Sequence, residues 1–281
     1  MATIAVIGGG TMGGGIAQIN AMRGFDTILY DVDDETVNRS LQKIQATIRK
    51  GVELGKTQPA DADSALARLR GAARLADLAP ADLSIEAVPE KLDLKRDLFA
   101  QLDTILKPHA LLATNTSSLS VTALAAATRR PEKVLGLHFF NPPHLMALVE
   151  VVRGDSTSQA TMDAGVAYTR AIGKTPVVCK DTPAFIVNRV ARPFYGEALR
   201  LLGENAADVP TIDSLVKTLG FRMGPFELID LIGLDVNFAV TQSTYNAFFH
   251  EPKYRPHPIQ QKMVEAGLLG RKTKKGFYEY P

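Results

Sequence analysis

The chain has 281 residues, 46% of them hydrophobic and 22% charged, with a formal net charge of +2, which is typical of a globular protein large enough for two domains. So small a net charge argues against a nucleic-acid binder, and no stretch reaches the ~18 apolar residues that a membrane-spanning helix needs. Because no signal peptide is visible and Cys179 is the single cysteine, we expect a cytoplasmic protein without disulfides, without a metal site, and with no nucleic-acid or membrane partner.

Apolar strands alternate with helical stretches through the first half of the chain. The pattern predicts strands at residues 3–7, 27–30, 83–87, 111–114, 134–138 and 148–152. A further strand is expected at residues 176–179, and its apolar neighbours favour an inert, buried Cys179 over a reactive one. Alternation at this spacing is typical of a largely parallel sheet with helices on both faces. The sequence therefore predicts a doubly wound, Rossmann-type α/β domain.

One connection is too long for a simple crossover, the stretch from about Asp34 to Asp77. Apolar residues recur there at helical spacing, namely Val37, Leu41, Ile44, Ile48 and Val52. A break at residues 55–59 follows, and then a second helical run through Leu66 and Leu69. We therefore expect a helical hairpin inserted into the sheet domain.

The character of the sequence changes after Lys180. Asp181-Thr182-Pro183 is typical of a connector, and strand patterns largely vanish beyond it. Helices are expected at residues 185–203, 211–219, 225–248 and 258–266. We therefore predict a sheet domain of residues 1–183 and an all-α C-terminal domain of residues 184–281.

A glycine-rich turn follows the first predicted strand. Gly8, Gly10 and Gly13, with Thr11 and Met12 between the last two, fit the pattern G-x-G-x-x-G. The pattern is weak by itself, but here it joins a strand to a helix, which is the context that dinucleotide binding requires. The first glycine permits a tight turn, the second lets the backbone approach a pyrophosphate, and the third lets the helix pack against the strand. The helix N-terminus then faces the phosphates.

The second predicted strand ends at Asp31, eighteen residues after Gly13. An acid at this place hydrogen-bonds the adenosine ribose and repels a 2′-phosphate, so it favours NAD over NADP. The alternative is an ordinary turn whose glycines occur by chance, followed by a capping Asp. The combined spacing favours NAD.

An enzyme that oxidises an alcohol with NAD needs a base for the hydroxyl proton. His138 ends an apolar strand, at the sheet edge where doubly wound folds bind ligands; alone it is equally explained as a structural histidine. Glu150 lies inside the apolar stretch Leu148-Val149-Glu150-Val151-Val152, where an unpaired carboxylate is costly to bury. It either orients an imidazole or faces solvent from an exposed strand face, and spacing leaves both open.

Several motifs together resemble the L-3-hydroxyacyl-CoA dehydrogenase family. They occur in order between Ile4 and Tyr280, at residues 114–118, 138–142, 148–151, 181–189, 224–228, 270–273 and 276–278. The chain length is similar to that of the short bacterial 3-hydroxybutyryl-CoA type. The resemblance implies NAD-dependent, reversible oxidation of a short (3S)-3-hydroxyacyl-CoA, and a homodimer formed through the C-terminal helical domain.

The resemblance also implies roles for single residues. His138 would be the general base with Glu150 as its partner, while Ser117 and Asn188 would hold the reacting oxygen of the substrate. Positions that contact the nucleotide in the family correspond here to Glu90, Lys95, Ser117, Asn141 and Lys272. Explanations without a role in function are also available: Ser117 would be a helix cap, Asn188 a solvent-facing amide and Lys95 a surface charge. Two departures, Ala147 and His144, lie near the active-site strand and could alter substrate preference.

Coenzyme A carries several phosphates, so its site should be cationic. On the predicted hairpin, Arg39, Lys43 and Lys50 fall within about 40° of one another around one helix. A solvated basic face explains any one of them, but as a cluster beside the cleft they suit a phosphate. We expect Lys50 and Lys56 to contribute to substrate binding.

Two other functions remain open at this stage. One is oxidation of a free hydroxy acid or sugar acid, as in the gulonate dehydrogenase and lambda-crystallin branch, whose Asn-Pro-Pro pattern Asn141-Pro142-Pro143 matches. The other is a redox-silent, NAD-binding structural protein. The basic hairpin and Phe139-Phe140 argue against the first, and the intact set of catalytic residues argues against the second.

Overall fold

The computed structural model describes residues 2–281, which form two compact units, one extending to Thr182 and the other beginning at Pro183. Within these residues the first unit is built on an eight-stranded sheet in the order β3-β2-β1-β4-β5-β6-β7-β8. The strands are β1 (Thr3–Ile7), β2 (Asp26–Tyr30), β3 (Leu69–Ala72), β4 (Leu83–Glu86), β5 (Leu111–Thr114), β6 (Val134–Phe139), β7 (Leu148–Arg153) and β8 (Thr175–Lys180).

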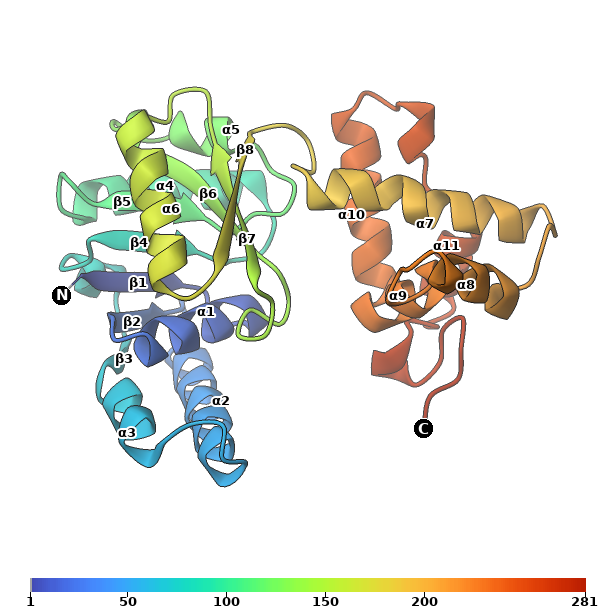
Figure 1. Ribbon diagram of the computed structural model, residues 1–281. Coiled ribbons are helices and arrows are strands. Elements are labelled where there is room, and N and C mark those ends of the chain that lie inside the picture. The colour runs from blue at the N-terminus through green and yellow to red at the C-terminus, as the bar shows by residue number, and fades with distance from the viewer. Residues whose placement is uncertain (1) are drawn as a thin grey trace. The chain divides into compact units, whose positions relative to one another are not determined.

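The sheet is parallel from β3 to β6, whereas β7 runs antiparallel to β6 and β8 runs parallel to β7. Strands β2 and β4 flank β1, so right-handed crossovers place the helices that lead to β2 and β5 on opposite faces (Figure 1). The helices of the layers are α1 (Thr11–Met22), α4 (Leu92–Ile105), α5 (Val121–Ala125) and α6 (Gln159–Ala171), with short 3₁₀ turns η1 (Leu75–Leu78) and η2 (Pro131–Lys133). The doubly wound α/β prediction is confirmed.

The long connection after β2 forms the predicted helical hairpin, α2 (Asp34–Glu53) and α3 (Pro59–Ala67). Asp33 caps α2 by accepting hydrogen bonds from the N–H groups of Glu35 and Thr36, as carboxylates at helix starts do. The expected second helix is wrong at Leu69, which begins edge strand β3 and pairs with Thr27. Tertiary pairing with β2 overrides the helical periodicity there.

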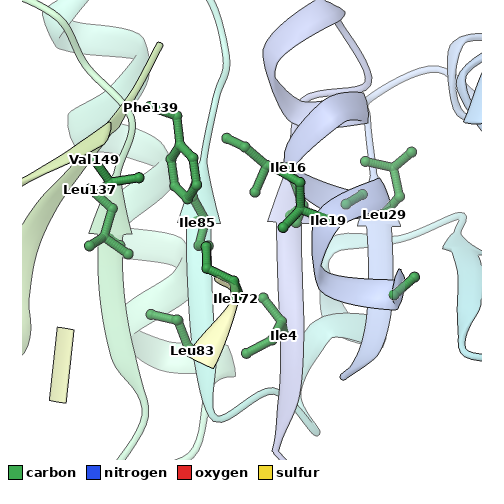
Figure 2. Packing of buried hydrophobic residues seen from close by; sticks show 14 of the residues in the cluster. Ile4, Ile16, Ile19, Leu29, Leu83, Ile85, Leu137, Phe139, Val149 and Ile172 are labelled. Atoms are coloured by element: carbon green, nitrogen blue, oxygen red, sulfur yellow. The ribbon is translucent and has the colours of Figure 1, made fainter. Parts of the chain in front are cut away.

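One apolar cluster of the first unit lies between the sheet and the helix layer of α1 and α6. Alternate residues of a strand face one side, so Ile4 and Val6 share this cluster with Ile16 and Ile19 of α1. Figure 2 shows how these α1 side chains lie against the sheet. The cluster also contains Phe139, at the end of β6. Close packing up to the strand ends fixes the edge from which the functional residues project.

The second unit is helical, and no helix among residues 2–281 has the length and apolar character to cross a membrane. Its helices are α7 (Val187–Gly203), α8 (Val209–Thr218), α9 (Pro225–Ile232), α10 (Leu234–Ala247) and α11 (Pro258–Glu265), with 3₁₀ turns η3 (Pro252–Tyr254) and η4 (Arg271–Thr273). The single helix expected at residues 225–248 is divided at Gly233, whose φ of 99° is unsuited to a helix.

Two buried carboxylates fasten the last residues of the chain to this unit. Asp230 accepts hydrogen bonds from the N–H groups of Phe277 (3.0 Å) and Tyr278 (2.9 Å). Asp213 accepts one from the Tyr278 hydroxyl at 2.8 Å. A Cβ at Gly276 would lie 2.2 Å from Asp230 Oδ1, so glycine is required where the tail meets the carboxylate.

Candidate active site

The glycine-rich turn between β1 and α1 allows no side chain at two of its positions. A Cβ at Gly8, where φ is 107°, would lie 2.6 Å from the carbonyl oxygen of Ala87, and one at Gly13 would lie 1.8 Å from the carbonyl oxygen of Gly8. At Gly10, by contrast, a Cβ would meet open space. Gly10 precedes the first turn of α1 and offers no side-chain cap, so the first amides of α1 are available to an anion.

Asp31 closes this turn from the end of β2. Its Oδ2 accepts a hydrogen bond from Gly9 N–H at 2.7 Å, and its Oδ1 accepts one from Val32 N–H at 2.8 Å. Asp31 also lines a cavity of about 260 Å³ whose walls are mainly apolar, formed by Ile7, Tyr30, Val32, Leu75, Val88, Leu94 and Leu98 among others. An apolar cavity with a carboxylate in its lining suits an adenosine, with the ribose hydroxyls against the acid.

His138 and Glu150 face each other directly across the antiparallel pair β6 and β7. The distance from His138 Nδ1 to Glu150 Oε2 is 2.6 Å, and the Glu150 side chain is fully buried. Residues that are opposite in an antiparallel pair project from the same face of the sheet, so the register alone brings the two side chains together. The alternative of a solvent-facing Glu150 is excluded.

This geometry decides which nitrogen of the ring can react. An ionised carboxylate only accepts hydrogen bonds, so Nδ1 donates its hydrogen to Glu150 and the lone pair of a neutral ring lies on Nε2. The Phe140 ring lies beside the imidazole, with centroids 4.5 Å apart. The contact with Glu150 holds the His138 ring in one orientation and favours the tautomer whose hydrogen lies on Nδ1.

Cys179 lies near this pair on β8, half-buried. Burial, together with the charges of Glu150 and Asp181, raises the pKa of its thiol to about 12. A thiol with so high a pKa stays protonated near neutral pH and is a poor nucleophile. This agrees with the interpretation of Cys179 as an inert residue.

Lys95 is buried, so the alternative that it is an ordinary surface charge is excluded. Its side chain is 1% exposed, and its Nζ lies 3.0 Å from Glu86 Oε1 and 2.7 Å from Glu90 Oε2. Thr114, on the neighbouring strand, donates a hydrogen bond to Glu86 Oε2 at 2.7 Å. The resemblance implied a nucleotide contact for Lys95, but in the structure its ammonium group lies between two carboxylates.

The two carboxylates beside Lys95 differ in electrostatic character. Burial raises the pKa of Glu86 although Lys95 opposes it. Burial acts on Glu90 in the same direction, yet the Lys95 charge and several hydrogen bonds outweigh it and lower the pKa of Glu90. Glu90 is therefore held as an anion. Sequence reasoning missed Glu86, although a Glu in the apolar strand Leu83–Glu86 gives the same signal that identified Glu150.

Glu90 in turn organises the loop that follows β5. Its Oε1 accepts hydrogen bonds from the N–H groups of Ser117 (3.0 Å) and Ser118 (3.2 Å) and from the Thr116 hydroxyl. Ser117 is not the cap of α5, because the Ser120 side chain fills that role. Strands β5 and β6 are parallel neighbours, so Ser117, which follows β5, and His138, which lies near the end of β6, belong to the same edge of the sheet.

The remaining candidates lie in different settings. Asn141 is exposed and lies two residues after the end of β6, so it belongs to the same edge as His138. Asn188 and Lys272 are part of the second unit, at the start of α7 and in η4. There the Asn188 carbonyl accepts a hydrogen bond from Arg192, and Lys272 pairs with Asp235.

The hairpin cations are distributed over two further cavities beside α1. Arg39 and Lys43 line one of about 370 Å³ together with Gly10 and Thr11. Lys56 lines a larger one of about 570 Å³. Arg49 pairs with Asp63 of α3 at 2.8 Å, whereas Lys50 is exposed on the last turn of α2.

Comparison with known proteins matches both units to one family. The model of the 3-hydroxyacyl-CoA dehydrogenase NAD-binding domain matches residues 3–182, and the model of its C-terminal domain matches residues 185–280. The 3-hydroxybutyryl-CoA dehydrogenase of Bradyrhizobium diazoefficiens is 44% identical, covering 99% of this chain and 94% of that protein. The 3-hydroxyadipyl-CoA dehydrogenase of Escherichia coli is 48% identical over 99% of this chain, which spans 59% of that relative's length. The crystal structure of (S)-3-hydroxybutyryl-CoA dehydrogenase from Ralstonia eutropha has a TM-score of 0.95 at 41% identity, with 100% of this chain and 99% of that chain covered.

Replacement of Lys95 tests the buried charge cluster. Lys95→Met leaves the buried Glu86 without its cation and removes the partner of the partly exposed Glu90, so we expect the free energy of unfolding to fall by about 3–5 kcal/mol. Lys91→Met, at an exposed position just before α4, should change it by less than about 0.5 kcal/mol. Chemical denaturation followed by circular dichroism measures both values, and equal stabilities of the two variants would refute a structural role for the cluster.

Proposed function

The chain belongs to the 3-hydroxyacyl-CoA dehydrogenase family of NAD-dependent oxidoreductases, and on that basis we propose that it reversibly oxidises a short (3S)-3-hydroxyacyl-CoA, such as 3-hydroxybutyryl-CoA, to the 3-oxoacyl-CoA. The observation that carries the proposal is the buried His138–Glu150 pair at the carboxyl edge of the sheet. Ligands bind at this edge in doubly wound folds. The glycine-rich turn and the cavity beside Asp31 fit the NAD nucleotide.

In this mechanism His138 acts as the general base. Its Nε2 receives the proton of the substrate hydroxyl while the carbon–hydrogen bond at the hydroxyl-bearing carbon breaks. NAD, when bound, supplies the acceptor for the departing hydride. The resulting imidazolium remains hydrogen-bonded through Nδ1 to Glu150, which stabilises its positive charge. In the reverse direction the imidazolium returns the proton to the carbonyl oxygen.

The other members of the site position the reactants. We assign Ser117 and Asn188 to the substrate oxygen and assign nucleotide contacts to Glu90, Asn141 and Lys272. Lys95 acts through Glu90, which holds the backbone of Ser117. A fixed backbone keeps a hydrogen-bond donor in place before the reaction begins, which lowers the cost of reaching the transition state.

Substitutions at the catalytic pair test this proton relay. His138→Gln removes the base, and we expect kcat to fall by about 10²–10⁴-fold with NADH affinity preserved. Glu150→Gln presents an amide N–H to Nδ1, which favours the ring tautomer protonated at Nε2, so kcat should also fall. His109→Gln, at an exposed histidine beside Asp82, is the matched control and should retain kcat.

Stopped-flow kinetics and NADH fluorescence titration separate the chemical step from cofactor binding. A His138→Gln enzyme with the kcat of the unmodified protein would eliminate His138 as the base. Loss of NADH binding together with kcat would instead point to a structural role for the residue.

The substrate class is tested by comparing a CoA thioester with the corresponding free acid as oxidants of NADH. We expect NADH oxidation with acetoacetyl-CoA and little with free acetoacetate, because only the thioester carries phosphates for the basic hairpin. Within a series of 3-hydroxyacyl-CoA substrates with acyl chains from C4 to C16, kcat/KM should be highest for the shortest chains. Preference for the free acid would favour the hydroxy-acid alternative over the acyl-CoA assignment.

We also propose a homodimer formed through the second unit. Several large apolar side chains of that unit are exposed, namely Val190, Leu215, Leu219, Phe221, Leu231 and Val236, and exposed apolar surface of this kind marks association sites. Light scattering coupled to gel filtration should give twice the mass of one chain. A mass equal to one chain at micromolar concentration would contradict the proposal.

A further inference from the structure

Arg192 is a buried cation that the mechanism does not use. It belongs to α7 and is 5% exposed. Among residues 2–281 no carboxylate lies within ion-pair distance of its guanidinium. Burial lowers the pKa of Arg192 to about 10, so the side chain is still charged at neutral pH. Because a buried charge without a counter-ion is costly, the guanidinium depends on neutral groups for compensation.

These neutral groups lie on two different helices. Arg192 Nε donates a hydrogen bond to the carbonyl oxygen of Asn188 in α7 at 3.3 Å. Its Nη1 donates to the carbonyl oxygen of Asn237 and to the Thr241 hydroxyl in α10, both at 2.9 Å. Asn237 Oδ1 in turn accepts a hydrogen bond from Gln260 Nε2 of α11 at 2.5 Å. One planar guanidinium therefore ties the first turn of α7 to a scaffold of α10 and α11.

The first turn of α7 needs such support. The chain enters this helix through Ala184 and Phe185, whose φ angles of 64° and 49° lie in the left-handed region that non-glycine residues rarely adopt. Each such residue costs about 1–3 kcal/mol and persists only where its surroundings hold it. Pro193 lies inside α7 and has no N–H, so the carbonyl oxygen of Arg189 lacks its usual helical donor. The start of α7 therefore depends on tertiary contacts more than a regular helix does.

We propose that Arg192 is a positioning residue for the reaction and acts through Asn188. This inference rests on the proposed function, in which Asn188 holds the reacting oxygen of the substrate. An apolar side chain of similar volume would pack at position 192 without an electrostatic cost, so the charge is explained by what it holds. Arg192 fixes the Asn188 backbone, one turn earlier in α7, to α10. A fixed backbone keeps the Asn188 amide in place before the substrate arrives, which lowers the cost of reaching the transition state.

A double-mutant cycle tests the assignment. The kcat for 3-hydroxybutyryl-CoA is measured in the unmodified protein, in Arg192→Met, in Asn188→Ala and in the variant that carries both changes. Arg192→Met by itself should lower kcat about tenfold, because the Asn188 hydrogen bond to the reacting oxygen is weakened. In the Asn188→Ala background the same change should have no further effect on kcat, since a residue that acts through another is not additive with it.

Arg200→Met is the matched control. Arg200 lies two turns farther along α7 and pairs with Glu197 at 2.8 Å, so its replacement should change kcat by less than about twofold. An Arg192→Met variant with an unchanged kcat, or an equal loss of kcat in both backgrounds, overturns the proposal. If Arg192→Met does not fold, Arg192→Lys takes its place in the cycle, because one ammonium group does not reproduce the fork that joins the two helices.

Amide hydrogen exchange gives a result that does not depend on turnover. The amides of residues 189–191 should exchange about tenfold faster in Arg192→Met than in the unmodified protein, whereas Arg200→Met should leave their exchange unchanged. Unchanged exchange in Arg192→Met overturns the positioning role. If the unmodified protein oxidises no 3-hydroxyacyl-CoA but exchange rises as expected, the proposed function fails and the support of α7 by Arg192 stands.

Discussion

The active edge of this protein depends on the cost of burying a carboxylate in an apolar sheet. Glu150 lies inside β7 and Glu86 ends β4, and the strand residues next to each are buried. Each carboxylate must therefore be compensated or leave the interior. The sheet compensates Glu150 with His138 and Glu86 with Lys95. Both pairs lie at the edge of the sheet where β4 and β6 end. The same requirement that keeps the sheet intact therefore also orients the His138 ring and anchors the loop that follows β5.

Strand direction makes this compensation possible. Because β7 runs antiparallel to β6, it begins at the edge at which β6 ends, and its third residue, Glu150, lies opposite His138. Farther along the sheet, β4 and β5 are parallel, and Thr114 lies beside Glu86. From there the chain of contacts continues through Lys95 and Glu90 to the Ser117 backbone. One edge thus carries the His138 imidazole, its carboxylate partner and the loop that Glu90 holds.

Much of the fold could be predicted from the sequence because the strands are short, apolar and separated by clear breaks. The first strand was predicted with its observed ends, and the glycine-rich turn lies where its spacing placed it. Prediction failed where a contact distant in sequence decides the conformation. Leu69 continues a helical pattern but pairs with β2, and Gly233 divides a periodic stretch through its positive φ. Both are cases in which tertiary context overrides a local preference.

The sequence by itself determined the doubly wound sheet, the dinucleotide turn and the types of residue available for chemistry. These follow from local periodicity and from glycines at positions where a Cβ would collide with the backbone. It could name His138, Glu150 and Lys95 but could not say what surrounds each. Only the tertiary structure decided that Glu150 meets the imidazole, that Lys95 is buried between Glu86 and Glu90, and that Arg192 meets Thr241 of α10. These are contacts between side chains that are far apart in the sequence. The pattern of residues along the chain does not determine strand direction or register.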